Sequence, residues 1–216
     1  MFSFSRKSES WKIYFDEGRV HGAAMRYEEA VASFRQAIQL APGEVYPHYE
    51  LGYTLFLLER YEEALKEFQR TNELQCGFFL VQTEIYMCEL VLSDTITPQV
   101  VTLLRLLQHM TDSGAAQSEQ AASISRKVIE LAPECALGYF YLGKALLGSE
   151  PQIAEECLQK CMELHPDDTT TIDAKGHLGL LSRQAGQEAE ARHIWEGIVA
   201  DYPNNPHISL IQTMVR

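Results

Sequence analysis

Apolar residues recur along the chain at the three- and four-residue spacing of amphipathic helices, and the pattern itself repeats. The segment MRYEEAVASF at residues 25–34 returns as ERYEEALKEF at residues 59–68, thirty-four positions later. Both copies carry a Tyr, a small Ala and a bulky Phe, and Gly18 and Gly52 each stand twelve residues before the Ala. A fixed period of this length predicts one helical unit that is copied and stacked.

Turn-forming residues mark the ends of these helices. Pro42 and Gly43 follow a periodic run that ends in Leu40, and Pro133 follows Leu131 in the same way. Proline and glycine stop helices because proline lacks the backbone donor and glycine favours turn conformations. The chain therefore predicts helices joined by short turns, and no strand is apparent.

The unit resembles the tetratricopeptide repeat, whose pattern has a Leu-Gly pair, an Ala, a bulky residue, a small residue and a Pro. The matching positions are Gly18, Ala30, Phe34, Ala37 and Pro42; Leu51, Gly52, Ala64 and Phe68; Leu142, Gly143, Ala154, Leu158, Cys161 and Pro166; and Leu178, Gly179, Ala191, Trp195, Ile198 and Pro203. Thr71 and Cys76 depart from it, and the turn after Gly143 is one residue short. The resemblance implies an all-α fold, an α-solenoid of stacked antiparallel helix pairs in a right-handed superhelix of about 11–12 helices with an irregular centre.

Small residues of this pattern are expected at the helix crossings, because two helices approach closely only where small side chains face each other. We expect Gly18 and Ala30 to mark the crossing within the first pair. Phe34, Phe68 and Trp195 are then expected to fill the space toward the next pair.

The middle of the chain departs from the repeat. Residues 78–92, FFLVQTEIYMCELVL, predict a buried helix, Thr97 and Pro98 predict a capped helix start running to about Met110, and 118–131 predicts a third helix. Three helices cannot all pair. One solution is two arrays, with 78–92 as a lone helix; the alternative pairs 78–92 with 98–110 and leaves 118–131 unpaired.

The two-array solution gives an N-terminal domain, residues 1–92, and a C-terminal domain, residues 93–216. The first holds repeats 11–44 and 45–78 and helix 78–92; the second holds a degenerate repeat 97–133, repeats 136–168 and 172–205, and a capping helix over 206–214.

Composition and charge narrow the classes of partner. With 216 residues and 46% hydrophobic content the chain can form a core without metals or disulfides. The net charge of −12 argues against nucleic acid, which needs clustered Lys and Arg. No apolar stretch is long enough to cross a membrane, and no secretory signal is apparent, so we expect no membrane insertion and a cytoplasmic location. The sequence leaves the oligomeric state open.

Candidate catalytic and metal chemistry is sparse. No catalytic or nucleotide-binding motif is found, and we expect neither enzymatic activity nor a cofactor. Cys157, Cys161 and His165 share one helical face, which invites a metal site. However, Cys161 takes the repeat's small buried position and a fourth ligand is lacking, so we interpret these cysteines as packing residues.

The resemblance also implies a binding groove, because in similar proteins the first helix of each pair lines the concave face. The corresponding residues here are Lys12, Phe15 and Arg19; Tyr46, Tyr49, Tyr53 and Phe56; and Leu137, Phe140, Lys144 and Leu147. The aromatic side chains of the second set suit a peptide or a helix. The competing interpretation is that they pack against the neighbouring helix, as aromatic stripes at helical spacing often do.

Function is expected to be binding. Relatives that clamp the acidic C-terminus of a chaperone use Lys, Asn and Arg at positions where this chain has Phe15, Arg19 and Glu50, which disfavours that activity. We expect an adaptor that holds a protein or peptide partner in the groove. The alternatives are a chaperone for a secreted or assembly-bound client and a regulatory subunit of an enzyme complex.

Overall fold

The computed structural model describes residues 10–78, 81–205 and 208–215, and these residues form helices and turns without a strand. Twelve helices are described, which confirms the all-α repeat fold expected from the sequence. They divide into two compact units, with the boundary between Leu92 and Ser93.

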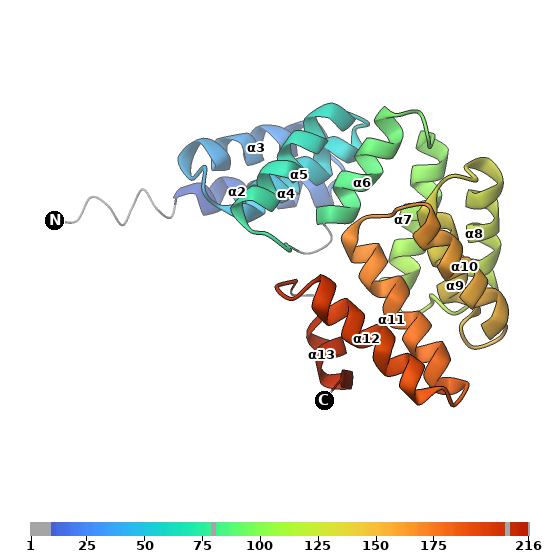
Figure 1. Cartoon of the computed structure of the whole chain (residues 1–216). Coiled ribbons are helices and arrows are strands. Elements are labelled where there is room, and N and C mark those ends of the chain that lie inside the picture. Colours follow the sequence, from blue (N-terminus) through green and yellow to red (C-terminus); the bar gives the residue numbers. More distant parts are fainter. Residues whose placement is uncertain (1–9, 79–80, 206–207, 216) are drawn as a thin grey trace. The chain divides into compact units, whose positions relative to one another are not determined.

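Unit 1 consists of five helices that pack in chain order (Figure 1). They are α2 (Ser10–Ala23), α3 (Tyr27–Leu40), α4 (Val45–Leu57), α5 (Tyr61–Leu74) and α6 (Val81–Leu92). α2 pairs with α3 and α4 with α5, while α6 covers α5; Phe79 and Leu80, part of the expected helix 78–92, lie outside the described residues. The first helices of the two pairs, α2 and α4, also touch each other.

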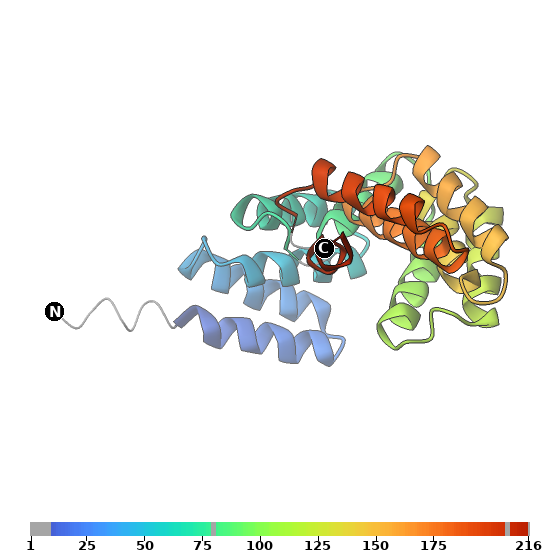
Figure 2. The same cartoon turned by 60° about the horizontal axis from the view of Figure 1, so that its bottom comes forward.

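Unit 2 consists of seven helices, and Figure 2 shows α11 and α12 lying side by side. The helices are α7 (Pro98–Asp112), α8 (Glu119–Leu131), α9 (Ala136–Leu146), α10 (Pro151–Glu163), α11 (Asp168–Gln184), α12 (Glu188–Asp201) and α13 (Ser209–Val215). α7 packs on α8, α9 on α10 and α11 on α12, and α13 closes the end on α12. Two residues of the expected capping helix 206–214, Pro206 and His207, are outside the described part of the chain.

Side-chain caps start several helices of unit 2. Thr97 accepts a hydrogen bond from the Val100 backbone N–H at 3.4 Å, with Pro98 at the first helical position, which confirms the capped start expected there. Asp167 accepts from the Thr170 backbone N–H at 3.1 Å and from its hydroxyl at 2.6 Å. Because this cap sits at Asp167, α11 begins at Asp168, ahead of the repeat start expected at residue 172.

The aromatic residue of each repeat lies on the glycine of its own pair. A Cβ on Gly18 would come within 2.5 Å of the Phe34 ring, and one on Gly52 within 2.9 Å of the Phe68 ring. Phe34 and Phe68 are 1% and 0% exposed. Each ring thus fills the space that the absent glycine side chain leaves inside its own pair, and Phe34 also lines a cavity with residues of α4, the first helix of the next pair.

The same turn joins the two helices of four pairs. The chain passes through a left-handed residue, Met25 (φ 58°), Glu59 (φ 59°), Gly114 (φ 78°) or Gly186 (φ 79°). The next backbone N–H bonds back five residues, for example Arg60 N–H to Leu55 O at 3.0 Å and Gln187 N–H to Ser182 O at 2.9 Å. These hydrogen bonds satisfy carbonyl oxygens at the end of the first helix that have no partner within the helix. Its presence between α7 and α8 gives that pair the local geometry of a repeat.

A compact apolar cluster closes unit 2. Trp195 of α12, 2% exposed, packs with Ile172 of α11, with Ala191 and Ile198 of its own helix, and with Ile208 and Ile211 beside and in α13. The indole N–H lies 3.4 Å from the Gly176 carbonyl oxygen. The short helix α13 is thereby held on the last pair by its apolar side.

Candidate functional site

The aromatic residues of α4 form a partly buried cluster with two residues from the following segments. The Tyr49 ring lies 5.0 Å from Phe78 and 6.0 Å from Phe68, measured between centroids, and stacks on Tyr53 at 6.4 Å. Tyr49 and Tyr53 are both half-buried. Tyr49 thus packs against three rings, whereas Tyr53, further along α4, lines a cavity.

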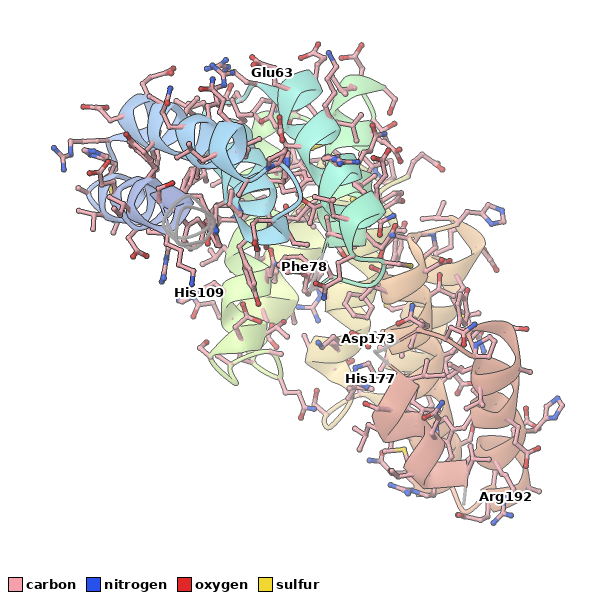
Figure 3. The ribbon with its side chains drawn as sticks, turned by 90° about the vertical axis from the view of Figure 1, so that its left-hand side faces the viewer. Glu63, Phe78, His109, Asp173, His177 and Arg192 are labelled. Carbon is pink, nitrogen blue, oxygen red and sulfur yellow. The ribbon has the colours of Figure 1, made fainter. Side chains whose placement is uncertain are left out.

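The other two aromatic residues expected in this groove lie in opposite environments. Tyr46 is 57% exposed and lies edge-on to Phe78 at 5.4 Å. Phe56 is 2% exposed and packs edge-on against Tyr61 at 5.2 Å. The placement of Phe56 in a binding groove is corrected by this burial, because the first residue of α5 covers it. Figure 3 shows Phe78 at one end of α5 and Glu63 near the other.

The first helix supplies two exposed cations and one half-buried ring. Lys12 and Arg19 are exposed, and Phe15 lies between Trp11 at 5.8 Å and Phe34 at 5.9 Å. The guanidinium carbon of Arg19 lies 5.9 Å from the Phe15 centroid, within cation–π range. The Phe15 ring therefore packs against the side chain of Arg19.

A cavity of about 300 Å³ lies among α2, α3 and α4. Its lining combines two expected groove residues with others: Arg19, Gly22, Ala23, Tyr27, Phe34, Glu50, Tyr53, Thr54 and Leu57. The Thr54 hydroxyl donates to the Glu50 backbone carbonyl at 2.7 Å, so it is turned into its own helix. The remaining lining is two tyrosine rings, apolar side chains, one cation and one carboxylate.

Glu50 is the distinctive group of this cavity. It is half-buried, and burial raises the pKa of its carboxyl while the nearby Arg19 charge lowers it. Among the residues that the structure describes, no side-chain hydrogen bond or ion pair reaches this carboxylate. A partly desolvated carboxylate without such a partner is unfavourable, and a ligand can relieve the cost.

The groove residues expected in unit 2 are mostly buried. Leu137 is 1% exposed and Phe140 6%, so neither offers a binding surface, and their placement in the groove is corrected. Leu147 is half-buried just past the end of α9. Lys144 is also half-buried, with its Nζ 5.2 Å from the Phe140 centroid.

Lys144 lines a second cavity, of about 290 Å³, between α9, α11 and α13. The other lining residues are Ile172, Asp173, Gly176, His177, Leu180, Leu210, Ile211 and Met214. Asp173 and His177 lie close together on α11 (Figure 3). Burial lowers the pKa of Lys144, and burial with the Lys144 charge lowers the pKa of His177 to about 4, so His177 is neutral near pH 7.

Sequence reasoning did not assign Glu50, Tyr27, Asp173 or His177 to a binding site. In the sequence Glu50 stands out only as a departure from a carboxylate clamp, yet it stands one position after Tyr49 on the groove-facing helix. The signal available was its charge on an otherwise aromatic face. Its proximity to Arg19 comes from the stacking of α4 on α2, which a sequence pattern does not specify.

Comparison with known proteins identifies the repeat. Residues 15–72 match the family model described as tetratricopeptide repeat. Residues 15–72 are thus tetratricopeptide repeats. The matched segment spans most of α2–α5 and so contains the first cavity.

The curated relatives of this chain also carry tetratricopeptide repeats, and they are much longer than this chain. The chain is 30% identical over 154 residues to the mitochondrial import receptor subunit TOM70 of Rattus norvegicus, covering 70% of this chain and 22% of the receptor. It is 28% identical over 152 residues to the Homo sapiens subunit, with the same coverage. The chain thus spans about a fifth of the length of these relatives, 22% in each case.

Solved structures with a similar helical arrangement include the TPR2AB domain of yeast Sti1 in complex with pHSP90. It shares 15% identity, with a TM-score of 0.45 and coverage of 96% of this chain and 98% of that one. Another is YrrB, described as a TPR protein with an unusual peptide-binding site, at 13% identity, a TM-score of 0.42, and coverage of 98% and 96%.

The described residues lack two kinds of feature. None of the helices there is both long and apolar enough to span a membrane. No cluster of three or more His, Cys, Asp or Glu in the described ranges is placed to hold a metal ion. Of the trio considered for a metal, Cys157 and Cys161 are buried in α10 and His165 is exposed beyond it.

Proposed function

We propose that this protein is a non-enzymatic interaction scaffold that holds a segment of a protein partner in the cavity between α2 and α4. The observation that carries the proposal is the cavity of about 300 Å³ into which Tyr53, Arg19 and Glu50 converge from the first helices of two repeats. Small binding sites have volumes that begin at about 300 Å³, so the space suits one or two side chains of a longer segment.

The surroundings of the cavity suit a polypeptide. Tyr46 and Lys12 are exposed on the same two helices, and Tyr53 presents a rigid ring with a polar tip. Tyr and Arg are enriched among the residues that dominate binding energy at interfaces. A segment lying along α2 and α4 would therefore gain contact area from tyrosine rings, which lose little conformational entropy on binding.

The proposal is tested by selection of peptides from a random nonapeptide phage library on the immobilised whole chain. Tyr53→Ala should weaken binding of the selected peptides at least tenfold, about 1.4 kcal/mol, as expected for a central interface tyrosine. Tyr53→Phe, which keeps the ring, should retain most of the affinity.

Tyr14→Ala is the matched control, because Tyr14 is an exposed tyrosine of α2 that does not line the cavity. Far-UV circular dichroism should be the same for all variants. If Tyr53→Ala binds the selected peptides as tightly as Tyr14→Ala does, the site is not in this cavity.

A further inference from the structure

The cavity of unit 1 has a chemical preference that goes beyond the holding of a segment. We propose that it takes a Lys or Arg side chain of the bound segment, with the cation meeting the Glu50 carboxylate and the aliphatic stem lying along the apolar wall. This inference rests on the proposed function, since it names the residue type that the same cavity recognises.

The carboxylate is the first reason. Glu50 is half-buried in the lining, with no hydrogen bond or ion pair to its carboxylate from the described residues. Its desolvation is therefore only partly compensated, by the field of Arg19. An ammonium or guanidinium group would supply charge-assisted hydrogen bonds, which are about twice as strong as neutral ones.

The tyrosines and the apolar wall are the second reason. Tyr27 and Tyr53 both line the cavity, and tyrosine rings attract cations through their faces. Phe34, Ala23 and Leu57 provide the apolar part of the wall. Long basic side chains bury such a stem while keeping the charged end with polar partners.

Charge is the third reason. Residues 1–92 hold 14 acidic and only 9 basic side chains, so the field of this part of the chain attracts cations. Glu50 is the single carboxylate among the lining residues. An acidic ligand drawn to Arg19 would approach this carboxylate and would raise the cost of keeping it charged.

The positive charge of Arg19 repels the proposed cationic ligand, and this repulsion can be used as a test. It lies at the same cavity, it is exposed, and its charge already stabilises the Glu50 carboxylate. A bound cation must share Glu50 with it. Removal of Arg19 should therefore tighten the binding of a basic ligand and weaken that of an acidic one, so the two ligand chemistries predict opposite signs.

The test uses the same random nonapeptide phage library on the whole chain, followed by fluorescence anisotropy of individual selected peptides. The wild type should select peptides with Lys or Arg enriched at one position. Glu50→Gln, which is nearly isosteric, should weaken these peptides about tenfold, and Arg19→Gln should tighten them about threefold. Replacing the basic residue of the peptide by norleucine should cost the wild type about tenfold and Glu50→Gln little.

Glu44→Gln is the matched control, because it removes the same charge from an exposed residue at the start of α4. It should change affinity less than twofold at physiological salt, where exposed charges are screened. An equal loss in Glu44→Gln and Glu50→Gln would mean general attraction to an acidic protein and would overturn the proposal.

Other outcomes separate this inference from the proposed function. Selected peptides that need Tyr53 but carry no basic residue would overturn the inference and leave the proposed function standing. Acidic peptides that weaken with Arg19→Gln would do the same. Peptides that bind Tyr53→Ala and the wild type equally would remove the proposed function and this inference together.

Discussion

Alanine at Gly179 should destabilise unit 2, whereas alanine at Gly197 should stabilise it. Both glycines lie inside helices of the same pair, α11 and α12. A Cβ on Gly179 would run into the Trp195 indole, within 2.7 Å of Cε2 and 2.8 Å of Cδ1, whereas one on Gly197 would meet nothing within 4 Å. The two substitutions therefore differ mainly in the room available.

The magnitude follows from two opposing effects. Replacing Gly by Ala inside a helix stabilises it by about 0.5–1 kcal/mol, because the unfolded chain loses freedom. This gain is common to both positions. Trp195 is 2% exposed and held by the surrounding isoleucines, so it cannot move away freely, and inserting a methyl group into such a core costs about 1–3 kcal/mol. The two variants should thus differ by about 1–3 kcal/mol in free energy of unfolding.

Urea unfolding of the whole chain, followed by far-UV circular dichroism, measures this difference, and Trp195 fluorescence in a Trp11→Phe background reports on unit 2. Trp195→Phe should cost less in the Gly179→Ala background than in the wild type, since the smaller ring relieves the clash. A Gly179→Ala protein as stable as Gly197→Ala would refute the claim that the indole occupies the space of the absent side chain.

Three further predictions concern caps, charges and pH. Asp167→Ala should lower stability by about 1 kcal/mol in thermal unfolding through loss of the cap of α11, and Asp167→Asn should restore most of it; equal stability of both would contradict the capping role. Arg60→Ala removes ion pairs to Glu63 at 2.7 Å and Glu28 at 3.4 Å, so the small loss of stability should shrink in high salt; a loss independent of salt would point to packing of the arginine stem instead. The folded pKa of His177 is lowered from 6.5 to about 4 by burial and Lys144, so the unfolded chain takes up the proton first, and this residue should reduce stability as pH falls from about 6.5 to 4 and leave it unaffected above that window. His177→Gln should remove that part of the pH dependence in urea midpoints, with Asp173 and Lys144 unchanged; parallel curves for the two proteins would contradict the assignment.

Sequence reasoning captured the repeat but not the neighbours of individual side chains. The thirty-four-residue period and the Gly-Ala pattern were enough to predict helix pairs, because a unit that cannot bury its own apolar face must stack. They did not place Phe34, since a period indicates which positions recur but not whether a ring points within a pair or beyond it. The position of the Phe34 ring beside Gly18 is a tertiary contact, which only the structure gives.

The candidate site shows the same limit. The helical face carrying Tyr49, Tyr53 and Phe56 was predictable, but which of them reaches solvent depends on what covers each one. Tyr61 covers Phe56, and Phe68 and Phe78 cover much of Tyr49. Glu50 and Arg19 come together only through the stacking of α4 on α2, which depends on tertiary contacts rather than on spacing within either helix.

The left-handed turns inside the pairs bear on how long a bound segment stays in place. Met25 and Glu59 occupy two of these turns, and the left-handed conformation costs a residue with a side chain about 1–2 kcal/mol. The turns at Gly114 and Gly186 avoid that cost. Local opening of a repeat depends on its own stability and that of its interfaces, so the first two repeats should open more often than glycine turns would allow. Glycine at Met25 or Glu59 would then lengthen the residence time of a ligand between α2 and α4 without altering a residue that lines the cavity.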